Sequence, residues 1–147
     1  MHEPLVSILI PFKNVAEYFE ECLESIQKQT YTNWEVVAVN DNSNDLSVTI
    51  AKSFAAKDAR FKILDNDAAG IITALRKAYL HSKGDYISRM DADDYMAKDR
   101  IKIMVESLAT HGKETLAIGK VKYFSKKGVK NGYDRYEKWL NKLTATG

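Results

Sequence analysis

The chain has 147 residues, of which 45% are hydrophobic and 29% are charged, so it is long enough to fold around a buried core. Its 22 basic and 20 acidic side chains leave a formal net charge of +2, which is too small for the basic surface that nucleic-acid binding requires. The one cysteine, Cys22, excludes an internal disulfide, and no apolar run approaches the ~18 residues of a membrane-spanning helix.

Short apolar runs alternate with amphipathic runs along the chain, beginning with a buried strand expected at Leu5–Ile10. Pro11 is expected to end the pairing of that strand because it has no backbone N–H. The next run places apolar side chains at helical spacing over residues 15–26. Asn14 and Glu17 have the spacing of a helix cap and its partner, so the sequence predicts that this helix is capped locally.

The alternation continues with a second strand expected at Trp34–Val39. The segment Asn40–Asp45 follows it and is rich in turn and cap formers. A helix is expected next, with Leu46, Ile50 and Phe54 facing inward.

A third strand is expected at Phe61–Leu64, followed by a third helix that ends near Gly84. The spacing of its apolar residues indicates which side chains of this helix face the core. They are Ile71, Ile72, Leu75, Ala78 and Tyr79.

A fourth strand is expected at Tyr86–Met90, followed by a helix whose apolar side chains lie within Ile101–Leu108. The segment Leu116–Phe124 alternates between apolar and polar residues and predicts a fifth, half-exposed edge strand. A last amphipathic helix is expected at Tyr133–Leu143.

Strands that alternate with helices of this length predict a Rossmann-like, three-layer α/β/α fold with a mainly parallel sheet, in one domain over residues 1–147. In such sheets ligands bind beyond the carboxyl ends of the strands, near the point where the strand order reverses. The residues expected at those ends are Phe12, Lys13, Asn14, Asn40, Asp41, Asp65, Asn66, Asp67, Asp91, Asp93 and Asp94.

The densest acidic cluster, Asp91–Asp94, follows the fourth expected strand. In an extended segment Asp91 and Asp93 point to one face and Asp94 to the other. Crowding three like charges costs free energy unless a cation or ligand offsets it. Asp and Asn also favour turns and helix caps, so the alternative that these acids are solvated turn residues stays open.

The sequence lacks both glycine-rich motifs that cradle a diphosphate, G-x-G-x-x-G after the first strand and G-x-x-x-x-G-K-[ST] anywhere. Carboxylates repel phosphate unless a divalent ion lies between them. Mg²⁺ or Mn²⁺ is commonly held by one or two carboxylates together with substrate phosphates. The acidic rim therefore favours a nucleoside diphosphate that is bridged to the protein by a metal ion.

Three segments in this order, Val6–Asn14, Val39–Asp45 and Gly84–Asp94, resemble family 2 glycosyltransferases with the GT-A fold. The resemblance implies inverting transfer of a sugar from a nucleoside diphosphate, with UDP favoured, to a saccharide or lipid-linked acceptor. It implies Mn²⁺ or Mg²⁺ as cofactor. Independently of the resemblance, the single cysteine favours a reducing compartment, so a cytoplasmic protein is expected, which would reach a membrane surface only through other segments.

The same resemblance implies roles for single residues at the rim. Asp41 would accept a hydrogen bond from the base, Arg76 would lie near base or phosphate, and Asp93 would be the principal metal ligand with Asp91 beside it. The implied nucleotide-sugar residues are Pro11, Phe12, Asn14, Asp41, Arg76, Asp91 and Ala92.

The chain departs from the family pattern at the turn after the second strand, where Asn40 and Asn42 replace an aspartate and a glycine. Asparagine tolerates left-handed backbone angles, so Asn42 is expected to stand in for the glycine. No catalytic base presents itself, because Asp134 and Glu137 lie on the last expected helix and not after a core strand. The chain is thus expected to be the donor-binding portion, without the acceptor-binding portion.

Other classes fit less well. A haloacid-dehalogenase-type phosphatase has its Asp-x-Asp pair after the first strand, and a response-regulator receiver needs acids there too, whereas this chain has Phe12-Lys13-Asn14. An EF-hand is excluded because Met96 occupies the position of the required glycine. A non-catalytic nucleotide-sugar-binding module or inactive fragment, and a plain interaction domain, remain as alternatives.

Overall fold

The computed structural model describes residues 3–112, 114–125 and 128–146, and the chain falls into two compact units that divide between Val105 and Glu106. The first unit carries the sheet, and the second carries the end of one helix, an extended segment and the last helix. The single domain expected over residues 1–147 stays a prediction.

Four parallel strands form the sheet of the first unit, in the order β3-β2-β1-β4. They are β1 (Val6–Phe12), β2 (Trp34–Asn40), β3 (Phe61–Asp65) and β4 (Tyr86–Arg89). In the register, β1 pairs with β2 along its whole length, but with β4 only as far as Leu9. The mainly parallel α/β architecture expected from the sequence is confirmed.

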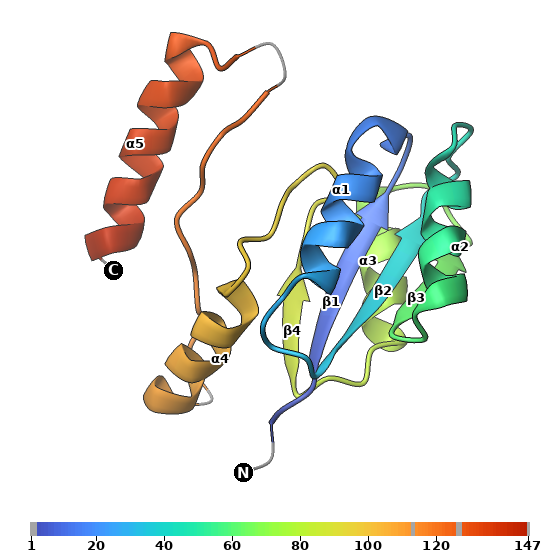
Figure 1. The fold of residues 1–147 in the computed structure, drawn as a ribbon, viewed down its shortest axis with the longest axis horizontal. Helices are drawn as coiled ribbons and strands as arrows, with labels where there is room; N and C mark the ends of the chain where they lie inside the picture. The colour runs from blue at the N-terminus through green and yellow to red at the C-terminus, as the bar shows by residue number, and fades with distance from the viewer. Residues whose placement is uncertain (1–2, 113, 126–127, 147) are drawn as a thin grey trace. The chain divides into compact units, whose positions relative to one another are not determined.

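Helices cover both faces of the sheet. In Figure 1, α1 (Ala16–Gln27) and α2 (Ser47–Lys57) lie in front of the sheet, and α3 (Ile71–Leu80) lies behind it. A fourth helix, α4 (Arg100–His111), follows the loop after β4. This is the expected three-layer arrangement, and it explains why the strands are nearly continuous apolar runs.

The core is divided by the sheet into two clusters because successive side chains of a strand point to opposite faces. Ile8, Ile10 and Phe12 of β1 pack toward α1 and α2, in the larger cluster. Leu9 packs on the other face with Ala74 and other side chains beneath α3. Every residue of β1 is buried, which anchors the point where the polar loops emerge.

Helix α3 meets the sheet through small side chains, which corrects the face expected from its sequence. Ala74 and Ala78 are fully buried, whereas Ile71, Ile72 and Tyr79 are 50%, 71% and 61% exposed. Two alanines four residues apart make a flat face that lets the helix lie close to the strands. Ala78 and the partly buried Leu75 face inward as expected, whereas Ile71, Ile72 and Tyr79 are left on the outer surface of the helix.

Pro11 does not end β1, which corrects a second expectation. Pro11 pairs with Val39 of β2, and β1 continues to Phe12. The oxygens of Leu9 and Phe12 accept from Met90 on the β4 side and Asp41 on the β2 side, respectively. Because N–H groups alternate along a strand, the missing N–H of Pro11 is on the β4 side, past the end of that pairing. The proline therefore removes no hydrogen bond from the sheet.

The fifth strand expected at Leu116–Phe124 is wrong for the residues the structure describes, since none of them in the second unit forms a strand. This extended segment is held by side chains of α5 (Asn131–Thr146). The amide of Asn141 donates to the oxygen of Val121 and accepts from its N–H, at 2.7 and 2.8 Å. Backbone groups that lack a partner strand are satisfied by the helix instead.

The two tryptophans differ in environment. Trp34 of β2 is 2% exposed and has the Arg60 guanidinium 3.7 Å from its ring centroid, whereas Trp139 of α5 is 54% exposed.

Among the described residues, no helix combines the length and the apolar character needed to cross a lipid bilayer.

Candidate functional site

The carboxyl ends of β1, β2 and β4 bring the predicted polar residues to one edge of the sheet. Lys13 and Asn14 follow β1, Asp41 follows β2, and Asp91 and Asp93 follow β4. Neighbouring strands are ~4.8 Å apart, so β2 and β4, on either side of β1, are separated by roughly 10 Å across the sheet. The strand order reverses between β1 and β4, which is where ligands bind in folds of this kind.

Pro11 and Phe12, both predicted to border a nucleotide, are buried at the end of β1. The ring of Phe12 packs against that of Phe19 with 4.6 Å between centroids, so it belongs to the core. The backbone oxygen of Phe12 accepts from the N–H of Asp41 at 2.8 Å. These residues therefore support the rim from below and fix the position of Asp41.

Asn14 joins the loop after β1 to the loop after β2. Its backbone has a left-handed φ of 51°, its Oδ1 accepts from the Asn44 N–H at 2.8 Å, and its own N–H donates to Ser43 Oγ at 3.1 Å. Asn42 also has a left-handed φ, 57°, which confirms its expected stand-in for glycine. The two loops are thus locked together at the rim.

The local cap expected for α1 is wrong, because Asn14 makes no cap bond to this helix and the caps come from the other loop. Asp45 Oδ2 accepts from the Ala16 N–H at 3.1 Å, and Ser47 Oγ accepts from the Val15 N–H at 2.9 Å. Asp45 Oδ1 also accepts from the Ser47 N–H. Hydrogen bonding to the Ser47 side chain lowers the pKa of Asp45 most, burial opposes it, and the backbone N–H groups of Ser47 and Ala16 add to the lowering. Asp45 is thereby a structural residue of two helix starts.

Asp41 is held in a small cradle at the start of α3. Its Oδ1 accepts from Asn66 Nδ2 and from the Gly70 N–H, both at 2.9 Å, and Oδ2 shares the Gly70 N–H at 3.1 Å. The Asn66 amide lowers the pKa of Asp41 most, followed by the Gly70 N–H, while burial opposes them and Lys13 adds a smaller lowering. Asp41 is therefore an ionised acceptor whose orientation is fixed before any ligand arrives.

The acidic cluster after β4 is a turn, so the alternation expected for an extended segment is wrong. β4 ends at Arg89, and the Asp94 N–H donates to the oxygen of Asp91 at 3.2 Å. Ala92 is buried and anchors the turn in the larger core cluster, while Asp91 and Asp93 are exposed. The cluster is thus pinned by its one apolar residue.

Charges within the cluster influence one another. Arg89 Nη2 forms an ion pair with Asp91 Oδ1 at 2.9 Å. Burial and then the carboxylates of Asp93 and Asp91 raise the pKa of Asp94. Cys22 lies beneath the cluster, where burial, followed by the carboxylates of Asp94, Asp93 and Asp91, raises the pKa of its thiol to about 12. The neighbourhood carries excess negative charge, which a cation would stabilise.

The described residues contain no group of three or more His, Cys, Asp or Glu side chains placed to enclose a metal ion. Asp91 and Asp93 fit a different mode of binding, in which one or two carboxylates share a hard cation with the phosphates of a ligand. Their exposure at the rim leaves room for such a ligand.

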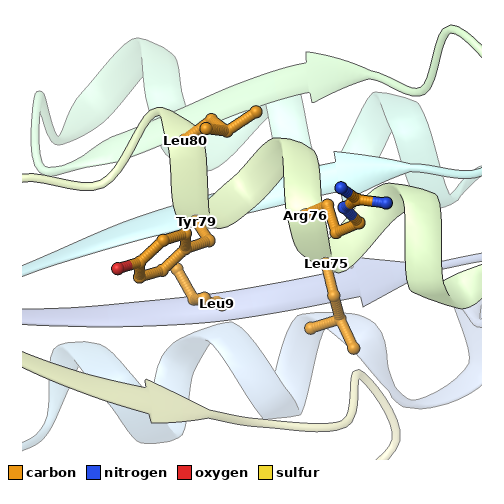
Figure 2. A pocket seen from close by; sticks show the side chains of 5 residues that line it. All are labelled: Leu9, Leu75, Arg76, Tyr79 and Leu80. Carbon is orange, nitrogen blue, oxygen red and sulfur yellow. The ribbon is translucent and has the colours of Figure 1, made fainter.

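Arg76 lies on the α3 face of the sheet. It lines a shallow groove of about 480 Å³ together with Leu9, Leu75, Tyr79 and Leu80. Figure 2 shows its guanidinium extending in the direction in which β1 points, toward the rim. Among the residues that line this groove, Arg76 carries the positive charge, and it lies toward the carboxyl end of β1.

The sequence predicted Asn66 at the rim but did not indicate that Asn66 and Gly70 orient Asp41. Asn66 follows β3 directly, and Gly70 precedes α3 with a φ of 117° that favours glycine. The sequence signal for this arrangement is an asparagine directly after a strand, followed by a glycine directly before a helix. Their partner Asp41 comes from another loop, which the sequence pattern does not reveal.

Comparison with known proteins places this geometry in a family. The model for "Glycosyl transferase family 2" matches residues 7–146. EpsH of Bacillus subtilis, named a putative glycosyltransferase, is 36% identical over 115 residues, which are 78% of this chain and 33% of EpsH. EpsJ of the same organism, an uncharacterized glycosyltransferase, is 35% identical over 70% of this chain and 30% of its own length. The chain spans about a third of the length of these relatives.

Solved structures show the same fold. TarS 1-349 of S. aureus, in complex with UDP-GlcNAc, gives a TM-score of 0.67 at 26% identity over 72% of this chain and 31% of that chain. The mannosyltransferase PcManGT of Pyrobaculum calidifontis, in complex with GDP-Man and Mn²⁺, gives 0.66 at 28% identity over 74% of this chain and 33% of that chain.

Proposed function

The chain belongs to glycosyl transferase family 2, and we propose that it forms the donor-binding portion of an inverting glycosyltransferase. Residues 1–147 would make one GT-A-like domain that binds a nucleoside-diphosphate sugar, with UDP favoured, through Mn²⁺ or Mg²⁺. The acceptor would be the hydroxyl of a saccharide or lipid-linked molecule. TarS with UDP-GlcNAc and PcManGT with GDP-Man and Mn²⁺ support this choice of ligand class.

One observation carries the proposal: a fixed acceptor and an acidic turn flank the end of the same strand. Asp41 lies on the β2 side of β1, and Asp91 and Asp93 lie on the β4 side. A nucleotide has its base at one end and its diphosphate at the other. The spacing of two strands lets the base meet Asp41 while the diphosphate reaches the acidic turn.

A divalent ion fits the acidic turn when the ligand supplies the remaining oxygens. Asp93 would be the principal ligand. Asp91 would be the second, since Arg89 occupies only its Oδ1. When bound, the ion neutralises the negative charge that grows on the diphosphate as the bond to the sugar breaks. Lys13 and Arg76 are cations of the same unit that would face base or phosphate.

A second candidate is a module that binds the donor without transferring the sugar. Two acids on α5 are candidates for a catalytic base, and the side chains of both already make contacts with other groups. Asp134 pairs with Lys138 at 2.8 Å, and Glu137 Oε2 accepts from the Tyr123 N–H at 2.6 Å. This favours binding over catalysis by the 147-residue chain itself.

Calorimetric titration of UDP with and without Mn²⁺ tests the proposal. We expect Mn²⁺ to strengthen UDP binding by about 10- to 100-fold, and Asp93→Ala to remove that gain, because the ion loses its principal ligand. The fold should survive, since the side chain is exposed.

Glu21→Ala, which removes an exposed carboxylate from α1, is the matched control and should leave the gain unchanged. Equal affinity of the wild-type chain for UDP in both buffers would contradict the metal bridge. Circular dichroism of each variant separates loss of binding from loss of fold.

A further inference from the structure

The amide of Asn66 lies at the centre of the contacts that hold Asp41. Asn66 Nδ2 is 2.9 Å from Asp41 Oδ1, 2.9 Å from Thr73 Oγ1 and 3.3 Å from the oxygen of Gly70. All three neighbours offer lone pairs, and the Thr73 hydroxyl itself donates to the Gly70 oxygen at 2.8 Å. The amide must therefore present its NH₂ group to this side, which fixes its orientation.

Asn66 is itself anchored to the sheet. Its backbone N–H donates to the oxygen of Asn40 at 2.8 Å, directly beyond the last paired residues of β2 and β3. The side chain therefore projects from a fixed backbone position and not from a free loop. A donor held in this way can hold a neighbouring carboxylate in one rotamer.

The hydrogen bonds to Asp41 are distributed unevenly between its two oxygens. Oδ1 accepts two bonds at 2.9 Å, from Asn66 and Gly70. Oδ2 receives only the longer branch of the shared Gly70 N–H, at 3.1 Å. A carboxylate oxygen accepts two hydrogen bonds readily, so the remaining acceptor capacity of Asp41 is on Oδ2.

We propose that Asn66 is a positioning residue of the nucleotide site, which occupies Oδ1 of Asp41 and so leaves Oδ2 to accept an N–H from the base. The inference rests on the proposed function and adds to it which nucleotide bases the site should accept. Uracil presents an N–H at N3 and guanine presents one at N1, whereas cytosine has a lone pair at N3. A fixed, acceptor-only carboxylate favours the first two bases and repels the N3 lone pair of the third.

Asparagine suits this position better than its nearest relatives. An aspartate would bring a second carboxylate to within hydrogen-bond distance of Asp41, where two like charges compete for one proton. An alanine would leave Oδ1 with only the Gly70 N–H and would free the carboxylate to rotate. Both changes remove the asymmetry between the two oxygens on which the selection depends.

The test compares UDP, CDP and N3-methyl-UDP as ligands of wild-type and Asn66→Ala chains, with Mn²⁺ present throughout. We expect wild type to prefer UDP over both analogues. In Asn66→Ala the affinity for UDP should fall about tenfold, while the affinities for CDP and N3-methyl-UDP should change little. A residue that merely supports the fold would weaken all three ligands by the same factor.

Asp67→Asn is the control, since this neighbouring acid is 87% exposed and pairs with Lys77, and it should leave the ratios unchanged. Thr73→Val removes one partner of the Asn66 amide without touching Asp41, so it should lower the UDP preference by a smaller factor and serves if Asn66→Ala does not fold.

An unchanged ratio of UDP to CDP affinity in folded Asn66→Ala or Thr73→Val would overturn the positioning role while leaving the proposed function intact. If wild type binds neither UDP nor GDP in the presence of Mn²⁺, the proposed function fails and the positioning role fails with it.

Discussion

A side chain at position 84 would collide with the start of β1. A Cβ built on Gly84 would lie 2.6 Å from both the N and the Oγ of Ser7, and 2.8 Å from the oxygen of Tyr86. Ser7 is fully buried, accepts from the Gly84 N–H at 2.8 Å and donates to Glu35 Oε1 at 2.6 Å. The glycine is therefore required by close approach and not by its backbone angles.

Gly84→Ala is expected to lower the free energy of unfolding by about 1 to 3 kcal/mol, because backbone atoms must shift to admit the methyl group. Urea denaturation followed by circular dichroism measures the change. Gly132→Ala on α5 is the control, since a Cβ there meets nothing within 4 Å. Equal stability of the two variants would mean that the β1 contact yields without cost.

The start of α1 depends on residues at the start of α2, which is a property of elements and not of single residues. Asp45 accepts from Ala16 of α1 and from Ser47 of α2, and the buried Ser47 hydroxyl accepts from Val15. Helix α1 would begin with unsatisfied N–H groups if the start of α2 were displaced, because both acceptors belong to that segment. The two loops that border the rim are thereby made rigid together.

Ser47→Ala should lower the free energy of unfolding by about 1 to 2 kcal/mol, because the Val15 N–H loses its acceptor in a partly buried position. Ser53→Ala is the control on the same helix, since its exposed hydroxyl only donates to the Ile50 oxygen. Chemical denaturation of both variants gives the comparison. A loss in Ser53→Ala as large as in Ser47→Ala would contradict the shared cap.

Local sequence patterns predicted the four strands and the helices but not the contacts between them, and they predicted a fifth strand that the described residues do not form. The four strands followed from apolar runs, and the rim followed from the polar residues at their ends. The expected cap of α1 was wrong because the true acceptors lie 29 and 32 residues further along the chain, at Asp45 and Ser47. The face of α3 was predicted correctly for Ala78 and Leu75 but not for Ile71, Ile72 and Tyr79, because spacing does not reveal that Ala74 and not the larger residues lies against the sheet.

The candidate site was predictable to a similar degree. Asp41, Asp91 and Asp93 were identified from their places after strands, and the fold brings them to one edge. The part played by Asn66 was not predictable, since it depends on the loop after β3 meeting the loop after β2. Contacts of that kind follow from the register of the sheet and not from any local pattern.

At the scale of the whole molecule, the hydrophobic clusters of the described residues lie entirely within the first unit. The larger cluster ends at Val105, and the smaller one lies between β1, β2 and α3. The second unit has its large apolar side chains mostly exposed, Leu116 and Trp139 among them. The stability of the sheet should therefore come from the first unit.

A shortened chain of residues 1–112, which keeps α4 whole, is expected to unfold cooperatively with the same urea midpoint as the full chain. The reason is that it retains every residue of both clusters. Circular dichroism against urea measures both. A lower midpoint or a non-cooperative transition in the shortened chain would show that residues 113–147 contribute to the stability of the sheet.

The placement of the two tryptophans gives each of the two units its own fluorescence signal. Indole emission shifts to longer wavelength as water gains access, so the enclosed Trp34 beneath Arg60 and the wetter Trp139 should fluoresce at different wavelengths. A fluorescence emission spectrum recorded during denaturation can thus be resolved into one component for each unit, without any added dye.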